Sequence, residues 1–151
     1  MIKIICVGKI KENFYKEAEK EYLKRLSKYT KIDIVELSDQ KDQDINYALS
    51  KEKDLILKNI KEKDNIVILD IKGKKYTSEE FSGFINDELT YNSNITFIIG
   101  SSNGLSSEIK SLAVKSISFS DMTFPHQLFR IILLEQIYRG FKIINNESYH
   151  K

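Results

Sequence analysis

The chain has one cysteine and one proline among its 151 residues, and no long apolar run. A single cysteine excludes an intrachain disulfide and the paired Cys-x-x-Cys spacing of zinc sites. Cys6 lies in an apolar run, which predicts a small buried side chain. No segment approaches the roughly 20 apolar residues of a membrane span, and the apolar stretch at the N-terminus is too short for a signal peptide. We therefore expect a soluble, cytoplasmic protein with no membrane partner.

Both common phosphate-binding motifs are missing. The loop after the first apolar run reads GKIKEN, without the G-x-G-x-x-G pattern, and no G-x-x-x-x-G-K-[ST] occurs in the chain. An ordinary dinucleotide-binding fold or a P-loop is therefore disfavoured.

Positive and negative charges nearly balance over the whole chain, but they are unevenly distributed along it. The formal net charge is +2, from 24 basic and 22 acidic residues. Residues 9–31 hold eight basic and four acidic side chains, an excess that suits a phosphate-bearing partner. A solvated helix in a lysine-rich protein explains the same pattern and is the commoner case.

Short apolar runs alternate with longer segments of helical period. The runs are rich in Ile, Val and Phe and cover residues 2–8, 31–37, 65–71, 94–100 and 116–120. Such runs predict strands, and their alternation with helices predicts a single α/β domain over residues 1–151. We expect a mostly parallel sheet with helices on both faces.

Three residues mark predicted helix starts. Thr77 opens T-S-E-E, a capping box in which Glu80 closes the pair. Ser106 suits the cap of a short helix, and Pro125 suits the first turn of the last one.

The loops after the last three predicted strands are the places to search for a ligand, because ligands of open α/β sheets bind beyond the carboxyl ends of the strands. These loops read ILDIKGK, IIGSSNGLS and FSDMTFPH. Gly100 and Gly104 bracket a tight turn, in which the backbone can approach a ligand closely because glycine has no Cβ. Alone, such a spacing more often marks only a turn.

The last predicted helix has apolar residues around its whole circumference. One sheet covers one side only, which predicts a second copy of the protein on the other. Glu135 and Arg139 are four residues apart and can form an ion pair on one face of the helix. A structural salt bridge is the favoured interpretation, and a role in a functional site is the alternative. His126 at the helix start is as consistent with packing as with function. The terminal Tyr149 and His150 could stack on a base and move a proton, although composition alone predicts a frayed end.

Three segments together resemble one known family. IIGSSNGLS, FSDMTFPHQLFRIILLEQIYRGFKI and the terminal YHK are similar to the ribosomal RNA large-subunit methyltransferase H family of the SPOUT superfamily. The similarity runs through nearly the whole chain. It implies a homodimer with a C-terminal trefoil knot that binds S-adenosylmethionine. It also implies methylation of N3 of a pseudouridine in large-subunit rRNA, at the intersubunit face of the assembled ribosome, without a metal.

The resemblance also assigns site residues. It implies that the cofactor is held by Leu69, Gly100 and the backbone of Phe119, Ser120, Asp121, Met122, Thr123 and Phe124. It places the candidate catalytic residues His126, Glu135, Arg139, Tyr149 and His150 around the reacting base. The family usually has two successive glycines after the fourth strand, and here the second is Ser101, whose hydroxymethyl group either crowds the cofactor or replaces a water.

Two other functions remain open. One keeps the fold and changes the substrate to a tRNA or another rRNA nucleotide. The other is a ribosome-binding module without catalysis, in which Ser101 marks a decayed cofactor pocket.

Overall fold

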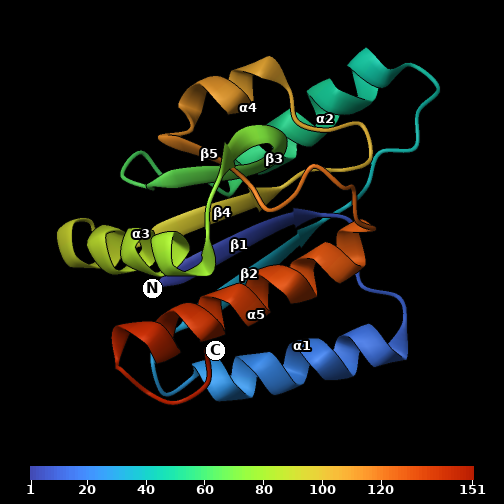
Figure 1. Ribbon diagram of the computed structural model, residues 1–151. Helices are drawn as coiled ribbons and strands as arrows, with labels where there is room; N and C mark the ends of the chain where they lie inside the picture. The colour runs from blue at the N-terminus through green and yellow to red at the C-terminus, as the bar shows by residue number, and fades with distance from the viewer.

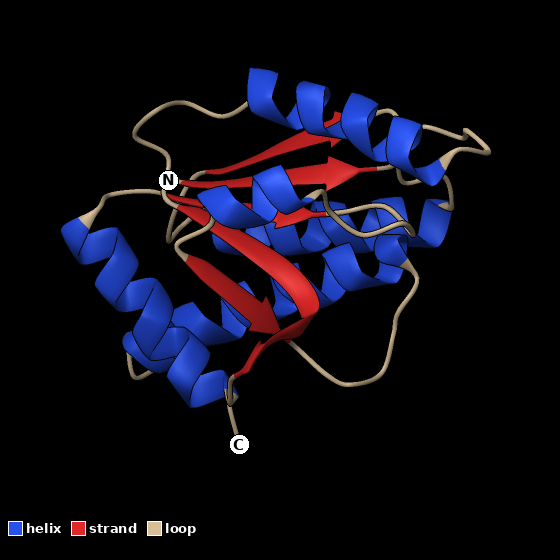
Figure 2. Ribbon diagram, turned by 90° about the horizontal axis from the view of Figure 1, so that it is seen from above, coloured by secondary structure: helices blue, strands red, loops and turns tan.

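A five-stranded parallel sheet forms the centre of the protein, in the strand order β2-β1-β4-β3-β5. The computed structural model describes residues 1–151. Figure 1 shows the arrangement, and Figure 2 shows the strand arrowheads directed toward one edge of the sheet. The strands are β1 (Ile2–Val7), β2 (Ile32–Leu37), β3 (Ile66–Lys75), β4 (Ile95–Ile99) and β5 (Lys115–Ser118). The helices are α1 (Asn13–Leu26), α2 (Ile45–Lys58), α3 (Ser78–Tyr91), α4 (Ser107–Leu112) and α5 (His126–Ile144).

Helices cover both faces of the sheet, as the alternation of segments predicts. Helices α1, α3 and α5 lie on one face, and α2 and α4 lie on the other (Figure 1). Successive side chains of a strand point to opposite faces. Ile4 accordingly packs under α5 in the larger core cluster, whereas Ile5 belongs to the cluster on the α2 side. Both are fully buried.

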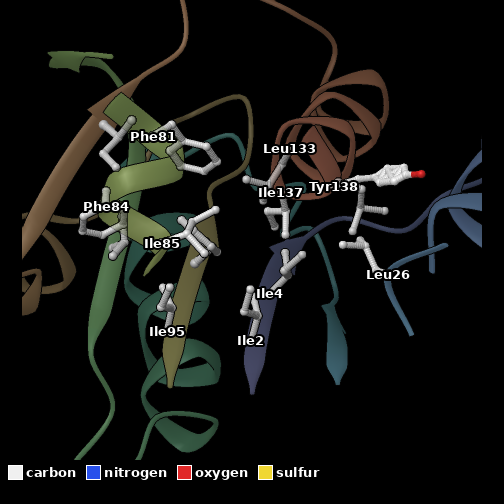
Figure 3. Close-up of a cluster of buried hydrophobic side chains, with 14 of the residues drawn as sticks. Ile2, Ile4, Leu26, Phe81, Phe84, Ile85, Ile95, Leu133, Ile137 and Tyr138 are labelled. Atoms are coloured by element: carbon white, nitrogen blue, oxygen red, sulfur yellow. The ribbon is translucent and has the colours of Figure 1, made fainter. Parts of the chain in front are cut away.

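The larger core is built mainly between the sheet and α3 and α5. Figure 3 shows Phe81 and Ile85 of α3 on one side and Leu133 and Ile137 of α5 on the other, above the β1 residues Ile2 and Ile4. Helix α5 is thus held between α1 and α3, which fixes where its two ends lie.

Strand β3 is longer than its apolar run predicts. It continues to Lys75 through a register shift against β5 between Leu69 and Lys74. Glycine is required at position 73, because a Cβ there would lie 2.7 Å from the backbone nitrogen of Ile117. The other four strands match their predicted positions to within two residues at each end.

The predicted caps are confirmed with one adjustment. Thr77 accepts a hydrogen bond from the Glu80 N–H while the Glu80 carboxylate accepts from the Thr77 N–H. Ser106 caps α4 through the Ile109 N–H. Pro125 stands at the N-cap of α5 rather than in its first turn, because its ψ of 137° is extended.

No helix in this fold has the length and apolar character needed to cross a membrane.

Candidate functional site

A cavity of about 350 Å³ opens at the carboxyl edge of β3, β4 and β5. This volume lies in the range of small-molecule sites. Apolar side chains from three strands, among them Leu69, Ile99 and Ile117, form its floor, and the loops that follow those strands form its walls. These are the three loops in which the sequence predicts a ligand site.

Seven of the eight predicted cofactor residues line this cavity: Leu69, Gly100, Phe119, Ser120, Met122, Thr123 and Phe124. Asp121 is the exception, because its carboxylate pairs with Lys75 and is 76% exposed. The loop that the resemblance assigns to the cofactor therefore lines the cavity, with the Asp121 side chain directed toward Lys75 instead.

The tight turn at Gly100 is confirmed. The Gly104 N–H donates to the Ser101 carbonyl at 2.9 Å, and Gly104 has a φ of 81° that favours glycine. A Cβ at position 100 would lie 2.6 Å from the Gly104 carbonyl oxygen. Glycine at position 100 thus lets the turn close while its backbone faces the cavity.

The Ser101 hydroxyl is engaged by helix α2. Its Oγ donates to Oε2 of Glu52, a buried residue of α2, at 2.9 Å. Burial raises the pKa of Glu52, and the hydrogen bonds from Ser101 and the Gln40 N–H oppose that rise. The serine is consequently tied to α2.

Several cavity residues were not singled out by the sequence. Asp70 is held by Lys110 of α4 at 3.4 Å, and both side chains line the cavity. Their signal was present, since Asp70 directly follows Leu69 in one of the three selected loops, but the pairing with α4 depends on the fold. The other cavity residues that the sequence did not single out are Ile71, Ile99, Ser102, Leu105, Ile117, Ser118 and Phe129, whereas Gly104 and Pro125 were named for their turns and Ser101 for its place after Gly100.

His126 lines the same cavity and packs against the end of β1. A Cβ at Gly8 would lie 2.8 Å from Nε2 of His126, and Gly8 has a φ of 120°. The next residue of α5, Gln127, accepts a hydrogen bond of 2.8 Å from the Lys11 N–H. The β1–α1 loop is therefore fastened to the start of α5 beside the cavity.

A buried arginine strengthens this junction. Arg130 is 1% exposed and donates to Glu36 at 2.8 Å, to Glu19 at 3.1 Å and to the Gly8 carbonyl at 3.0 Å. Burial alone would raise the pKa of Glu36, but the hydrogen bonds from the Ile10 N–H and from Arg130 hold it below its usual value. Cys6 beneath this network is confirmed as buried, and burial raises its pKa to about 12.

The other predicted catalytic residues gather at the far end of α5. Glu135 and Arg139 form an ion pair with a shortest distance of 2.7 Å. The Tyr149 hydroxyl donates to Glu135 at 3.1 Å, and Arg139 lies over the Tyr149 ring at 4.8 Å. Burial, followed by the charge of Glu135, raises the pKa of Tyr149. The expectation of a frayed terminus is wrong, because Tyr149 and His150 pack half-buried on α5.

Both ring nitrogens of His150 are engaged. Nδ1 lies 3.1 Å from Nη1 of Arg139, and Nε2 lies 2.7 Å from Oε1 of Glu79 at the start of α3. Because a guanidinium can only donate, this geometry assigns Nδ1 as the acceptor and places the ring proton of a neutral imidazole on Nε2. The hydrogen bond with His150 holds the pKa of Glu79 below its usual value. Neither nitrogen is free to take a proton until a contact opens.

The cavity and the terminal cluster are separated along α5. The nearest members of the two groups along α5, His126 and Glu135, are nine residues apart, which corresponds to about 14 Å. The arrangement implied by the resemblance, with all five candidate catalytic residues around one base, does not occur within this chain. His126 belongs with the cavity, whereas Glu135, Arg139, Tyr149 and His150 form a second group.

The outer surface of α5 and its leading loop carries apolar side chains. Phe124 and Met122 are 37% and 75% exposed, and Leu128, Ile131 and Ile132 are only partly buried. The sequence predicted an apolar surface all round; the structure shows that α1, α3 and the sheet cover part of it.

A parallel α/β sheet with such a cavity at its carboxyl edge is typical of proteins that bind a nucleotide-like ligand. A family model described as "Predicted SPOUT methyltransferase" matches residues 1–150. A relative from Clostridium botulinum (strain Langeland) is 55% identical over 157 residues, covering 99% of each chain, and is named ribosomal RNA large subunit methyltransferase H. A relative of the same name from Caldicellulosiruptor saccharolyticus is 50% identical, covering all of both chains. The chain therefore belongs to the SPOUT methyltransferases, and among them to the ribosomal RNA large subunit methyltransferase H family.

A solved structure supports the fold. A probable methylase family protein from Haemophilus influenzae matches 99% of this chain and 70% of its own, with a TM-score of 0.59. The two share 14% sequence identity, so this likeness concerns the fold alone.

Proposed function

We propose that this methyltransferase transfers a methyl group from S-adenosylmethionine to N3 of a pseudouridine in large-subunit rRNA, acting in the cytoplasm as a homodimer on the assembled ribosome. The full-length identity of 55% to a protein named ribosomal RNA large subunit methyltransferase H carries the proposal. The cavity at the carboxyl edge of β3, β4 and β5 adds support, since seven of the eight residues that the family resemblance assigns to the cofactor line it.

The cavity residues fit the chemistry of the cofactor. Leu69, Ile99 and Ile117 offer an apolar surface for an adenine ring, and the turn at Gly100 offers closely approaching backbone. Asp70 and the hydroxyl of Ser120 line the same cavity and provide acceptors for polar groups of the ligand. When bound, the cofactor supplies a methyl group on a positively charged sulfur, which needs no metal.

The protein's own task in the reaction is to prepare the nucleophile. The N3–H of pseudouridine keeps its proton near neutral pH, so this proton must leave or the resulting charge must be stabilised. We assign His150 as the group that accepts it at Nδ1 once Arg139 has turned toward the base. Arg139, still oriented by Glu135, then stabilises negative charge on a ring oxygen.

The separation of the two groups along α5 favours a site assembled from two chains. One chain would supply the cavity with His126, and a second copy would supply Tyr149, His150 and the Glu135–Arg139 pair. The partly exposed apolar residues Phe124, Leu128 and Ile131 give α5 a surface for this pairing. A trefoil knot formed by the three loops around the cofactor is part of the proposal.

The decisive experiment offers methyl-labelled S-adenosylmethionine to the protein together with intact ribosomes, separated subunits or bulk tRNA. We expect label in large-subunit rRNA of intact ribosomes, on one pseudouridine at N3 by mass spectrometry of the digested RNA. Label in tRNA or on another rRNA nucleotide would show that the substrate is not the proposed pseudouridine. Binding to ribosomes with no label and no calorimetric signal for the cofactor would favour a non-catalytic module.

A further inference from the structure

We propose that Glu147 is a positioning residue that anchors the start of the terminal tail, residues 148–151, and thereby sets where Tyr149 and His150 lie. The inference rests on the proposed function, because it concerns the delivery of these two side chains to the reacting base. Neither composition nor the family resemblance singled out Glu147.

Three side chains from two elements converge on the Glu147 carboxylate. The Tyr29 hydroxyl, just after α1, lies 2.8 Å from Oε1 and 2.9 Å from Oε2. Lys142 in the last turn of α5 donates to Oε2 at 2.8 Å, and Lys28 lies 3.8 Å from the same oxygen. The hydrogen bond from Lys142, followed by that from Tyr29, holds the pKa of Glu147 below its usual value. The carboxylate therefore links the tail both to the turn after α1 and to α5.

The backbone before Glu147 is also fixed. Asn145 ends α5 with its side-chain amide donating to the Phe141 carbonyl at 2.8 Å. Asn146 has a φ of 54°, a conformation that asparagine tolerates better than most residues. The Glu147 N–H then donates to the Lys142 carbonyl at 2.8 Å, which turns the chain back along α5.

Tyr29, which donates to the Glu147 carboxylate, is held in place by the core. The Tyr29 ring stacks on Phe141, with centroids 5.4 Å apart and planes 6° from parallel. Phe141 is buried in the larger core cluster. The hydroxyl that meets Glu147 is thus tied to the hydrophobic core, although the carboxylate itself remains 36% exposed.

The anchor limits where the tail can go. The three steps from Glu147 to His150 span at most about 10 Å. Lys142, which holds Glu147, is 13 residues along α5 from Phe129, the nearest residue of that helix that lines the cavity, which corresponds to about 20 Å. An anchored tail therefore keeps to the Glu135–Arg139 end of α5 and serves a cavity only where a second copy brings one to that end.

Loss of the Glu147 contacts should affect the tail and not the fold of the whole domain. The Glu147 side chain is 36% exposed, so the loss of its ion pair should cost the whole fold little, release the tail and leave the domain folded. The two observables are the amide exchange of residues 148–150 and the single-turnover methylation rate at saturating cofactor.

The test compares Glu147→Gln with Glu62→Gln, which makes the same charge change at an exposed turn position. Tyr29→Phe serves as a second variant, because it keeps the stacked ring and removes only the donor. For Glu147→Gln we expect at least fivefold faster tail exchange and at least a fivefold lower rate on ribosomes, since small displacements of reacting groups are costly. We expect unchanged cofactor affinity, a smaller effect of Tyr29→Phe in the same direction, and no effect of Glu62→Gln.

Two results would overturn the anchor: tail exchange in Glu147→Gln equal to that of the wild type, or an unchanged rate alongside faster exchange. A wild-type protein that incorporates no methyl group on any RNA would instead overturn the proposed function. The exchange comparison would then still judge whether Glu147 anchors the tail.

Discussion

The hydroxyl of Ser101 donates a hydrogen bond of 2.9 Å to the carboxylate of Glu52, which is 2% exposed in α2. The resemblance noted from the sequence implies a glycine at this position, and the serine found here raised the question whether it crowds the cofactor. The bond ties the extra hydroxymethyl group to helix α2 behind the turn. The serine side chain thereby links the turn at Gly100 to that helix.

Ser101→Gly should lower stability without improving cofactor binding. Removing the donor leaves the buried Glu52 with only the weaker contact from the Gln40 N–H at 3.4 Å, which should cost about 1–3 kcal/mol. Urea unfolding measures this change, and calorimetry with S-adenosylmethionine should give a Kd within about threefold of the wild type. Ser102→Gly, at the exposed neighbouring position, is the matched control for stability. Cofactor binding that tightens tenfold in Ser101→Gly would show that the hydroxymethyl group crowds the site.

Arg130→Met should destabilise the protein strongly. The substitution removes the guanidinium shared by Glu19 and Glu36 and leaves the Gly8 carbonyl without its donor. Breaking a buried ion network costs about 3–5 kcal/mol, and the partial exposure of both carboxylates favours the lower end. Arg25→Met, which breaks the exposed pair with Glu21 on α1, should change the unfolding midpoint little. Equal midpoints for the two variants would mean that the buried network adds no stability.

Glu36 should make part of this stability acid-sensitive. Its pKa is lowered in the folded protein from an ordinary value of 4.5, so the unfolded chain binds the proton more readily. The contribution is present above that ordinary value and is lost as the pH falls through the lower folded value. The difference in unfolding free energy between wild type and Glu36→Gln should therefore shrink below pH 4.5. A difference that stays constant or grows on acidification contradicts the assignment.

Local patterns predicted the elements well because their causes are local. The continuous apolar run at residues 2–8 predicted a buried strand, and all of β1 is buried; the Thr77–Glu80 capping box depends only on residues three apart. The three ligand loops followed from the direction of the strands in a parallel sheet. These inferences need no knowledge of which helices meet.

Contacts between residues far apart in the chain could not be predicted from the sequence. Arg130 pairs with carboxylates 94 and 111 residues away, and nothing near it indicates that an arginine is buried at that position. The docking of the tail depends on Tyr29, 118 residues before Glu147. The orientation of Ser101 likewise depends on a carboxylate 49 residues earlier. Each of these contacts requires the helices to be in place first.

His150→Ala should lower the methylation rate and spare cofactor binding. The imidazole lies in the terminal cluster, away from the residues that line the cavity of its own chain. Loss of a proton-accepting group typically costs at least about tenfold. Single-turnover rates on ribosomes and calorimetry with the cofactor measure the two effects, with Ser148→Ala as the neighbouring control. An unchanged rate would remove His150 from the chemistry and leave the tail with binding alone.

Neutralising exposed lysines of α1 should weaken the salt dependence of ribosome binding. Lys16, Lys20 and Lys24 are exposed on this helix, and none of them contacts the tail anchor, whereas Lys28 lies near Glu147. Each phosphate contact contributes about 0.7–0.9 to the slope of log K against log salt concentration, so converting all three to Gln should reduce the slope by about 2.

The control for that measurement lies at the other edge of the sheet. Lys58, Lys61 and Lys63 are exposed at the end of α2 and in the turn before β3, on the side opposite the cavity. Their conversion to Gln makes the same change in net charge. If ribosome binding depended only on the total charge of the protein, both triple variants would lower the slope of log K against log salt concentration equally. That result would mean that α1 is not the docking surface. A loss confined to the α1 variant would place the ribosomal phosphates along the helix that packs beside α5, next to the turn that holds Glu147.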